Sequence, residues 1–344
     1  MAAESGAPWG WDDAHRALSI AVVGATGAVG RELLLLLSEA GHPRERIACT
    51  ARRSHALDLG RAGYFEVLGG SAPPRADLAF LCTPSDVSRA LAPAIAEQGC
   101  LVIDLSSALR MLPEIPLVIP EINGELLANR PRIVANPNCT TAVAALPLAA
   151  LDRAARLVEA IIVSYQAASG VGLAGLTALA AETRAAAEGS EVPGGASPFP
   201  ATLALNVIPG VAEIEPEGKS GEERKIEEEL AKILDRPDLV VEATTARVPV
   251  ERCHSVAVHA RFARALTPGE ARRVLSAAPG VLLSEDPHGP RPRECAGTDP
   301  VHVGRVRAGA RGAGSLCFFA VGDQLRKGAA LNAFQIAARL PARR

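Results

Sequence analysis

The sequence predicts an α/β protein with two domains, a doubly wound sheet followed by an α+β domain with a sheet of its own. The chain has 344 residues, about twice the ~150 residues of a typical domain. Near its start, the apolar run at 18–23 is followed by the glycine-rich segment GATGAVG and a helical pattern. Further short apolar runs alternate with helical patterns as far as residue 105. This alternation is typical of a parallel sheet with helices on both faces.

The first domain is expected to span residues 17–137. Short apolar runs predict strands at 18–23, 46–51, 77–82 and 101–105. Helical spacing of apolar residues predicts helices at 31–40 and 86–98.

The second domain is expected to span residues 138–322, where the pattern of apolar residues along the sequence changes. Helical patterns lie at 139–151 and 217–234, and a Gly/Ala-rich helix with a loop is expected within 170–195. Strands are expected at 157–165, 240–250, 255–262, 301–307 and 315–321, and a Pro/Gly-rich loop at 286–300. Residues 323–344 contain a helix at 325–340 that ends the chain.

Composition excludes several classes of protein. Hydrophobic residues make up 48% and charged residues 22%, as in an ordinary globular protein, and this excludes wholesale disorder. The 36 Lys and Arg residues are balanced by 38 Asp and Glu residues, so the chain lacks the positive field of proteins that bind nucleic acids or anionic membranes. Aromatic residues make up only 3%, too few for a platform that stacks bases. We therefore expect no nucleic-acid or membrane partner.

Targeting and cysteine patterns indicate the cytoplasm. No apolar run reaches the ~18–20 residues that span a bilayer, and residues 1–16 lack the features of a signal peptide. We expect residues 1–16 to form an extension ahead of the fold. The seven cysteines are odd in number and never form a CxxC pair, so they match neither a disulfide framework nor a zinc site. The sequence thus predicts a protein of the reducing cytoplasm that binds no metal.

The glycine-rich segment 24–30 predicts a Rossmann-like dinucleotide site. It follows a strand and opens a helix, where glycines permit a tight turn and helix amides bind a pyrophosphate. Its spacing is G-x-x-G-x-x-G, and the alternative is a purely structural turn. The residues expected to contact the cofactor are Gly24, Thr26, Gly27, Ala28, Val29 and Gly30.

The end of the second strand favours NADP(H) over NAD(H). An acidic residue there usually binds the unphosphorylated ribose, whereas this chain has Arg52, Arg53 and Ser54. A guanidinium suits the extra phosphate of NADP, and we assign Arg53 and Ser54 to the cofactor. The alternative is that both arginines are solvated loop charges.

Cys139 is the candidate nucleophile. It stands in NPNCTT at the start of a predicted helix, where exposed amides and the helix dipole favour the thiolate. The other six cysteines lie in apolar runs or loops and have the character of small packing residues. A nucleophilic cysteine with a nicotinamide cofactor indicates attack on a carbonyl followed by hydride transfer.

Seven motifs carry a resemblance to the bacterial aspartate-β-semialdehyde dehydrogenases, from about residue 18 to residue 340. They occur in the order found in that family: GATGAVG (24–30), DLSSALR (104–110), NPNCTT (136–141), SYQAASG (164–170), PFPATLALNVIP (198–209), ARVPVERCHS (246–255) and LRKGAALNAFQIA (325–337). The resemblance implies a Rossmann-like NADP-binding domain and an α+β catalytic and dimerisation domain. It also implies that the C-terminal helix returns to the first domain.

The resemblance also implies roles for individual residues. Cys139 matches the nucleophile, Gln166 the glutamine that orients the substrate, and His254 the acid/base histidine. Arg247 resembles the arginine that binds the substrate α-carboxylate, and Glu222 the acid that pairs with its ammonium, with Glu223 as the alternative. The remaining substrate-binding residues that the resemblance implies are Arg110, Lys225 and Asn138.

Two positions depart from the family pattern. Gln324 stands where an asparagine is expected near the nicotinamide, and we assign it to the cofactor site. Cys253 precedes His254 where a glycine is common. Neither departure removes a catalytic group.

The implied activity is the reversible NADPH-dependent reduction of L-aspartyl-β-phosphate to L-aspartate-β-semialdehyde and phosphate through a cysteine thioester. This reaction serves the biosynthesis of lysine, threonine, methionine and isoleucine, and the family implies a homodimer or homotetramer. One alternative is an N-acetyl-γ-glutamyl-phosphate reductase, although that family usually has glycine where this chain has Asn138. The other alternative is a non-catalytic paralogue of the same fold.

Overall fold

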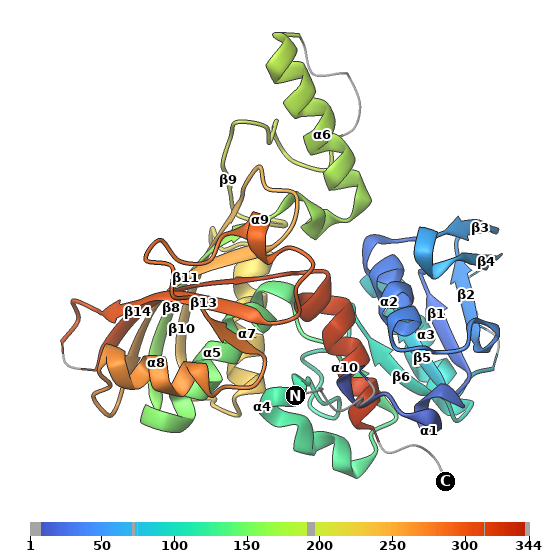
Figure 1. Cartoon of the computed structure of the whole chain (residues 1–344), viewed down its shortest axis with the longest axis horizontal. Coiled ribbons are helices and arrows are strands. Elements are labelled where there is room, and N and C mark those ends of the chain that lie inside the picture. The colour runs from blue at the N-terminus through green and yellow to red at the C-terminus, as the bar shows by residue number, and fades with distance from the viewer. Residues whose placement is uncertain (1–7, 71–72, 74, 191–196, 313, 341–344) are drawn as a thin grey trace, which may run out of the picture. The chain divides into compact units, whose positions relative to one another are not determined.

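The structure, a computed structural model, describes residues 8–70, 73, 75–190, 197–312 and 314–340 (Figure 1). It divides the chain into two compact units, one of residues 1–137 together with 329–344, and one of residues 138–328. Each unit contains a seven-stranded sheet. The predicted α/β architecture with two sheets is confirmed.

The sheet of the first unit has the strand order β3-β4-β2-β1-β5-β6-β7. The strands are β1 (Ile20–Val23), β2 (Ile47–Ala51), β3 (His55–Asp58), β4 (Tyr64–Gly69), β5 (Leu78–Leu81), β6 (Leu101–Asp104) and β7 (Ile133–Ala135). All neighbouring pairs are parallel except β3 and β4, which are antiparallel. The sequence did not predict β3, β4 and β7, because these strands are short and the first two carry alternating polar residues rather than continuous apolar runs.

Helices cover both faces of this sheet. They are α1 (Asp13–Arg16), α2 (Ala28–Glu39), α3 (Ser85–Glu97), α4 (Pro120–Asn123) and α10 (Leu331–Arg339), with short 3₁₀ turns η1 (Pro8–Gly10), η2 (Arg44–Arg46), η3 (Gly60–Ala62) and η4 (Gly124–Asn129). Successive β1 side chains point to opposite faces. Ile20 and Val22 pack in one core with α2 and α10, whereas Ala21 and Val23 pack in the other with α3.

The prediction that residues 1–16 extend ahead of the fold is wrong for the described part of that segment. Trp11 is fully buried, and its ring centroid lies 4.6 Å from that of Phe334 in α10. The adjacent α1 begins with a capping box between Asp12 and His15. A buried indole contributes a large apolar area, so residues 8–16 belong to the core of the first unit.

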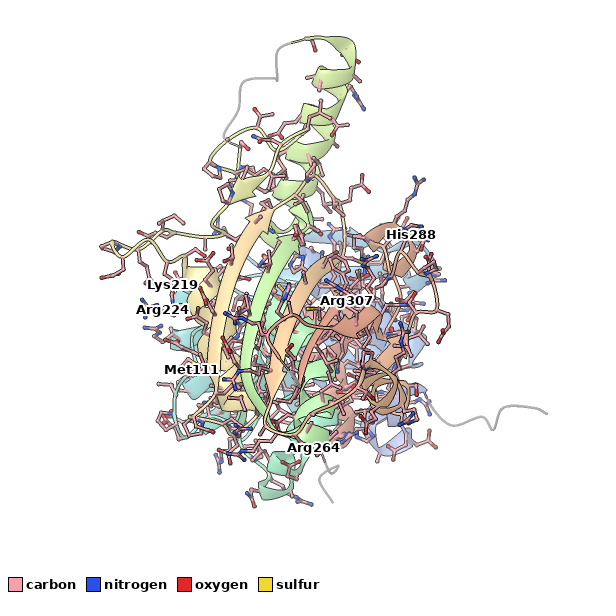
Figure 2. The ribbon with its side chains drawn as sticks, turned by 90° about the vertical axis from the view of Figure 1, so that its left-hand side faces the viewer. Met111, Lys219, Arg224, Arg264, His288 and Arg307 are labelled. Atoms are coloured by element: carbon pink, nitrogen blue, oxygen red, sulfur yellow. The ribbon has the colours of Figure 1, made fainter. Side chains whose placement is uncertain are left out.

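The sheet of the second unit has the order β12-β13-β14-β11-β8-β10-β9. Its strands are β8 (Leu157–Gln166), β9 (Ile208–Pro209), β10 (Val240–Arg247), β11 (His254–Phe262), β12 (Val281–Leu283), β13 (Val301–Ala308) and β14 (Ser315–Gly322). Its helical segments are α5 (Cys139–Ala155), η5 (Ala168–Val171), α6 (Leu173–Glu188), α7 (Gly221–Ile233), α8 (Pro268–Ser276), α9 (Pro292–Cys295) and the π-helical turn η6 (Arg326–Ala330), whose last two residues belong to the first unit. The predicted loop at 286–300 thus contains α9, and the sequence missed α8, β9 and β12. Helices α5, α7 and α8 pack on this sheet, and Figure 2 looks onto the face that they leave open.

The chain returns to the first unit between Gly328 and Ala329, six residues beyond the predicted boundary at 322/323. Hydrogen bonds keep the intervening residues in the second unit: the Asp323 carboxylate accepts from the Arg252 side chain and from the backbone N–H of Gly297. No helix within the described residues is long and apolar enough to cross a membrane.

Candidate active site

One edge of the second sheet collects three of the candidate side chains. Strands β8 and β10 are parallel and pair in a register that places Gln166 opposite Arg247 at their carboxyl ends. Strand β11 is antiparallel to β8 and begins at His254. Because β11 runs opposite to β8 and β10, it begins at the edge of the sheet where those two strands end. Gln166, Arg247 and His254 therefore share this edge.

Cys139 is the first residue of α5, and Asn138 is its N-cap. The Asn138 side-chain oxygen accepts from the backbone N–H groups of Thr140 and Thr141 at 2.9 and 3.0 Å. This cap fixes the first helical turn, and the thiol is half-buried. A side chain at this position lies in the positive end of the helix dipole, which favours a thiolate.

A network of buried carboxylates connects Asn138 to α7. The backbone N–H of Asn138 donates to Glu229 at 2.6 Å, and its side-chain amide donates to Glu222 at 2.8 Å. Glu222 also accepts from the Gln166 amide at 3.3 Å and lies 3.5 Å from the Lys225 ammonium. The structure therefore brings residues from α5, α7 and β8 into one polar cluster beside Cys139.

The structure separates the roles of Glu222 and Glu223. Glu223 forms a capping box with Ser220 at the start of α7 and accepts from the backbone N–H of Thr245 at 2.8 Å. Its carboxylate thus holds the helix and β10 together. Glu222, one position earlier, is the residue whose side chain reaches Asn138 and Gln166.

His254 is completely buried, and its Nδ1 accepts a hydrogen bond from the backbone N–H of Ala167 at 3.1 Å. Its Nε2 is buried and has no hydrogen-bond partner within the described chain. Burial, with a smaller contribution from Arg247, lowers the pKa of His254 to about 3. The imidazole is therefore neutral near pH 7, with its proton on Nε2.

Arg247 lies against both His254 and Gly170. Its Nη1 donates to the carbonyl of Ala167 at 2.7 Å, and a Cβ on Gly170 would lie 2.5 Å from the same atom. Burial lowers the pKa of Arg247, while the charges of Cys139 and Glu222 act in the opposite direction. A buried guanidinium with one bound carbonyl keeps further donors for an anionic partner.

The glycine turn of the first unit has the geometry of a dinucleotide site. Gly24 has φ +84, and a Cβ there would lie 2.2 Å from the carbonyl oxygen of Cys82. Gly27 caps α2 without a side-chain hydrogen bond, so no cap side chain occupies the first amides of the helix, which are groups able to bind an anion. The adjoining cavity of about 580 Å³ is lined by Val23, Gly24, Thr26, Gly27, Ala51, Arg52, Gly70, Cys82, Thr83, Pro84 and Val87.

Several predicted cofactor residues do not line this cavity. Neither Arg53 nor Ser54 lines it, although the neighbouring Arg52 does. Ala28, Val29 and Gly30 form the first turn of α2. A Cβ on Gly30 would lie 2.5 Å from the Gly24 carbonyl oxygen, so that glycine lets the helix approach the turn.

The last two candidates lie elsewhere. Arg110 is in the first unit, where its Nε donates to the backbone carbonyl of Asn136 at 2.8 Å. Gln324 is in the second unit and buried, where its side-chain oxygen accepts from the backbone N–H of Cys253 at 2.7 Å and its amide donates to Ser169.

Comparison with known proteins places the chain in a family. The model described as "Semialdehyde dehydrogenase, NAD binding domain" matches residues 19–130, and "Semialdehyde dehydrogenase, dimerisation domain" matches residues 148–327. The chain is 39% identical to the aspartate-semialdehyde dehydrogenase of Streptomyces akiyoshiensis, covering 93% of this chain and 97% of that one. It is 34% identical to the enzyme of that name from Bacillus subtilis, covering 94% and 97%.

The chain belongs to the aspartate-semialdehyde dehydrogenase family. The crystal structure of aspartate-semialdehyde dehydrogenase II from Vibrio cholerae superimposes with a TM-score of 0.87 at 32% identity, covering 93% of this chain and 97% of that one. The same enzyme complexed with ASA superimposes equally well, at 31% identity over 94% and 98%.

Against this family background, the structure adds residues that the sequence did not single out. Glu229 is buried beneath Asn138, and the backbone of Gly328 packs on Cys139, where a Cβ would lie 2.9 Å from the cysteine Cβ. A glutamate in a charged helix and a glycine in an Ala-rich segment carry no local signal of such contacts. Cys253, which the sequence did single out, packs with Cys295 in a small buried cluster, and burial raises the pKa of both thiols.

Proposed function

We propose that this chain catalyses the reversible conversion of L-aspartyl-β-phosphate to L-aspartate-β-semialdehyde and phosphate with NADPH. The observation that carries the proposal is the placement of Cys139 at a capped helix N-terminus beside Gln166, Glu222 and Arg247, with His254 at the same sheet edge. The family membership and the ASA bound to the Vibrio cholerae relative support the same substrate.

In the first step, the Cys139 thiolate attacks the acyl carbon of the substrate. A C–S bond forms, the C–O bond to phosphate breaks, and inorganic phosphate leaves behind a thioester on Cys139. The helix N-terminus favours the attacking thiolate. Gln166 orients the acyl carbonyl at the sulfur.

NADPH, when bound at the glycine turn, supplies the hydride that takes the thioester to the aldehyde level. The neutral His254 keeps its proton on Nε2, because Nδ1 is occupied by the Ala167 N–H. His254 therefore acts in its resting state as a hydrogen-bond donor and acid toward an oxyanion, a role where one donor is typically worth ~2.7–4 kcal/mol. Collapse of the tetrahedral intermediate returns the thiolate to Cys139.

Charged side chains define the substrate. Arg247 binds the α-carboxylate through its remaining donors, and Glu222 accepts from the ammonium. Lys225, whose ammonium lies 3.5 Å from Glu222, provides positive charge for the phosphate. A buried glutamate suits a free amino group, and this favours aspartyl phosphate over the N-acylated substrate of N-acetyl-γ-glutamyl-phosphate reductases.

NADP(H) is the proposed cofactor, with Arg52 as the contact to its extra phosphate. Arg52 lines the cavity beside the glycine turn and follows β2 directly, where an acidic residue would favour NAD(H). Gly24, Thr26 and Gly27 hold the dinucleotide in this proposal. The seven cysteines are all free thiols, in line with a reducing cytoplasm.

We also propose that the active protein is a homodimer joined through the open face of the second sheet (Figure 2). Residues 148–327 match a dimerisation domain. Tyr165 is 39% exposed, and its ring lies 6.3 Å from that of Phe319 on the neighbouring part of the sheet. Aromatic side chains such as Tyr165 are enriched in interfaces.

The decisive experiment measures NADP⁺ reduction by the purified chain with L-aspartate-β-semialdehyde and phosphate. We expect turnover that requires phosphate, disappears in Cys139→Ala and persists in the matched control Cys100→Ala. Activity with N-acetylglutamate semialdehyde alone would assign the chain to the acetylglutamyl reductases. Folded protein that binds NADPH but turns over neither aldehyde would be the non-catalytic paralogue.

A further inference from the structure

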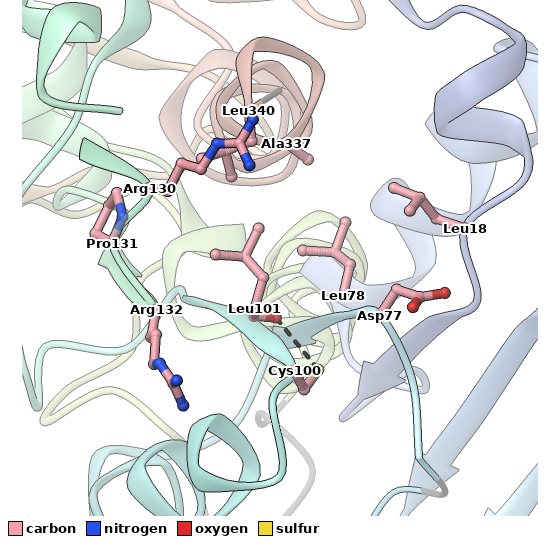
Figure 3. A pocket seen from close by; sticks show the side chains of 10 residues that line it. All are labelled: Leu18, Asp77, Leu78, Cys100, Leu101, Arg130, Pro131, Arg132, Ala337 and Leu340. Atoms are coloured by element: carbon pink, nitrogen blue, oxygen red, sulfur yellow. Dashed lines mark hydrogen bonds between the residues drawn. The ribbon is translucent and has the colours of Figure 1, made fainter. Parts of the chain in front are cut away.

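A second cavity of the first unit lies at the edge of the sheet opposite the glycine turn (Figure 3). Gly24 follows the carboxyl end of β1, whereas Leu78 and Leu101, which line this cavity, are the first residues of β5 and β6. In a parallel sheet all amino ends lie at one edge and all carboxyl ends at the other. The two cavities of this unit are therefore separate.

The walls of this cavity are mainly aliphatic. Leu78 and Leu101 stand side by side in Figure 3, with Leu18 to their right and Ala337 and Leu340 of the C-terminal segment above them. The volume is about 300 Å³, at the lower end of the range in which proteins bind small molecules. An apolar cavity of this size favours a short aliphatic chain.

The guanidinium of Arg130 adds one positive charge to these apolar walls. The Arg130 guanidinium extends toward Ala337 and Leu340 in Figure 3, and within the described chain it has no hydrogen bond or ion pair. Its backbone is in the left-handed region at φ +48, closes η4 by donating to the Leu127 carbonyl at 3.0 Å, and precedes Pro131. These constraints fix the backbone from which the Arg130 side chain extends.

The other charged groups around the cavity are already engaged. The Asp77 carboxylate accepts from the backbone N–H and the hydroxyl of Ser19 at 2.8 and 2.7 Å. Arg132 donates to the carbonyl of Ala96 at 3.2 Å and extends away from Leu78 and Leu101 in Figure 3. Arg130 is thus the lining group with an unused charge in the described chain.

We propose that this cavity binds a small molecule with one carboxylate and a short aliphatic chain. The carboxylate pairs with the Arg130 guanidinium, which presents parallel N–H donors to it. The aliphatic chain packs on Leu78, Leu101 and Ala337. This site is independent of the proposed catalytic reaction and of the cofactor.

Isothermal titration of the full chain with hexanoate tests the proposal, with acetate and hexylamine as probes that lack the chain or carry the opposite charge. We expect hexanoate to bind more tightly than either probe. Arg130→Gln should weaken hexanoate binding by about tenfold or more, because a charge-assisted bidentate pair is lost. Arg89→Gln, at an exposed position of the same unit outside the cavity lining, is the control and should leave the affinity unchanged.

Filling the cavity and adding the cofactor test the same site in two further ways. Ala337→Leu, which fills the cavity from α10, should abolish hexanoate binding while the thermal unfolding temperature shows that the variant is folded. Saturating NADP⁺ should not displace hexanoate, because the cavities lie at opposite edges of the sheet. Absence of hexanoate binding to the wild type, equal binding to Arg130→Gln, or displacement by NADP⁺ would each overturn the proposal.

Discussion

The Nδ1 atom of His254 accepts a hydrogen bond from the backbone N–H of Ala167 at 3.1 Å. This bond connects the first residue of β11 to the residue after β8, so the sheet itself sets the ring orientation. Because the backbone amide can only donate, it fixes the tautomer with the proton on Nε2. Burial keeps this neutral form stable by lowering the pKa to about 3.

His254→Asn should keep the contact with Ala167 through the asparagine oxygen and lose the Nε2–H donor. We expect kcat to fall by about 10²–10⁴ with little change in KM, because general acid–base groups act mainly in the transition state. Steady-state kinetics with L-aspartate-β-semialdehyde measures this split. A variant with wild-type kcat would remove His254 from the chemistry.

Gly328→Ala should impair Cys139 directly. The added Cβ would lie 2.9 Å from the Cβ and 3.3 Å from the Cα of Cys139, so the start of α5 must move, at a cost of about 1–3 kcal/mol in the free energy of unfolding. We expect a lower kcat and slower alkylation of the Cys139 thiol by iodoacetamide. Gly269→Ala, where the new Cβ meets nothing within 4 Å, is the control and should behave as the wild type.

Gly170→Ala should weaken substrate binding without unfolding the protein. The new Cβ would lie 2.5 Å from the Arg247 Nη1, and the flexible end of that side chain is what must move. We expect a KM for the semialdehyde raised by about tenfold, the effect of roughly 1.4 kcal/mol. The Kd for NADP⁺, measured by fluorescence titration, should stay at its wild-type value, and a parallel loss of NADP⁺ affinity would contradict this role.

Arg52→Gln and Arg53→Gln form a matched pair that tests cofactor selection. Only Arg52 lines the cavity beside the glycine turn. Arg52→Gln should therefore lower the ratio of kcat/KM for NADP⁺ to that for NAD⁺ by about tenfold or more, since a guanidinium–phosphate pair is lost. Arg53→Gln should leave this ratio unchanged. The reverse outcome would restore Arg53 as the phosphate contact.

His42 should make the protein less stable in weak acid. It is 4% exposed beside Trp11, and burial lowers its pKa to about 4. Between about pH 6.5 and 4 the unfolded chain binds a proton that the folded chain does not, so stability falls as pH falls through this window, by about 3 kcal/mol in all.

His42→Phe should remove the His42 part of this slope, because phenylalanine has no proton to bind, while the part that comes from the buried His254 remains. Urea unfolding at a series of pH values measures the difference from the wild type. His55→Phe, at an exposed position, should keep the wild-type slope. An unchanged slope in His42→Phe would show that this histidine does not contribute.

Much of the fold was predictable because its signals are local. The strands β1, β2, β5 and β6 are short continuous apolar runs, and α2 directly follows the glycine turn. Strands β3 and β4 form an antiparallel pair at the sheet edge, and β4 begins with alternating exposed and buried residues. In the sequence, such a short alternation is hard to distinguish from a polar loop. The burial of Trp11 was not predictable from its polar neighbours in the chain, because it depends on distant residues such as His42 and Phe334.

The sequence by itself determined the two-sheet α/β architecture, the glycine turn and a cysteine at a helix start, since each depends on residues close together in the chain. Tertiary structure decided between neighbours that are chemically alike: Glu222 rather than Glu223 reaches Asn138, and Arg52 rather than Arg53 lines the cavity. One residue along a helix turns the side chain by about 100°, and one along a strand turns it to the opposite face. Which direction meets the site depends on contacts such as Asn138–Glu222, between residues 84 positions apart.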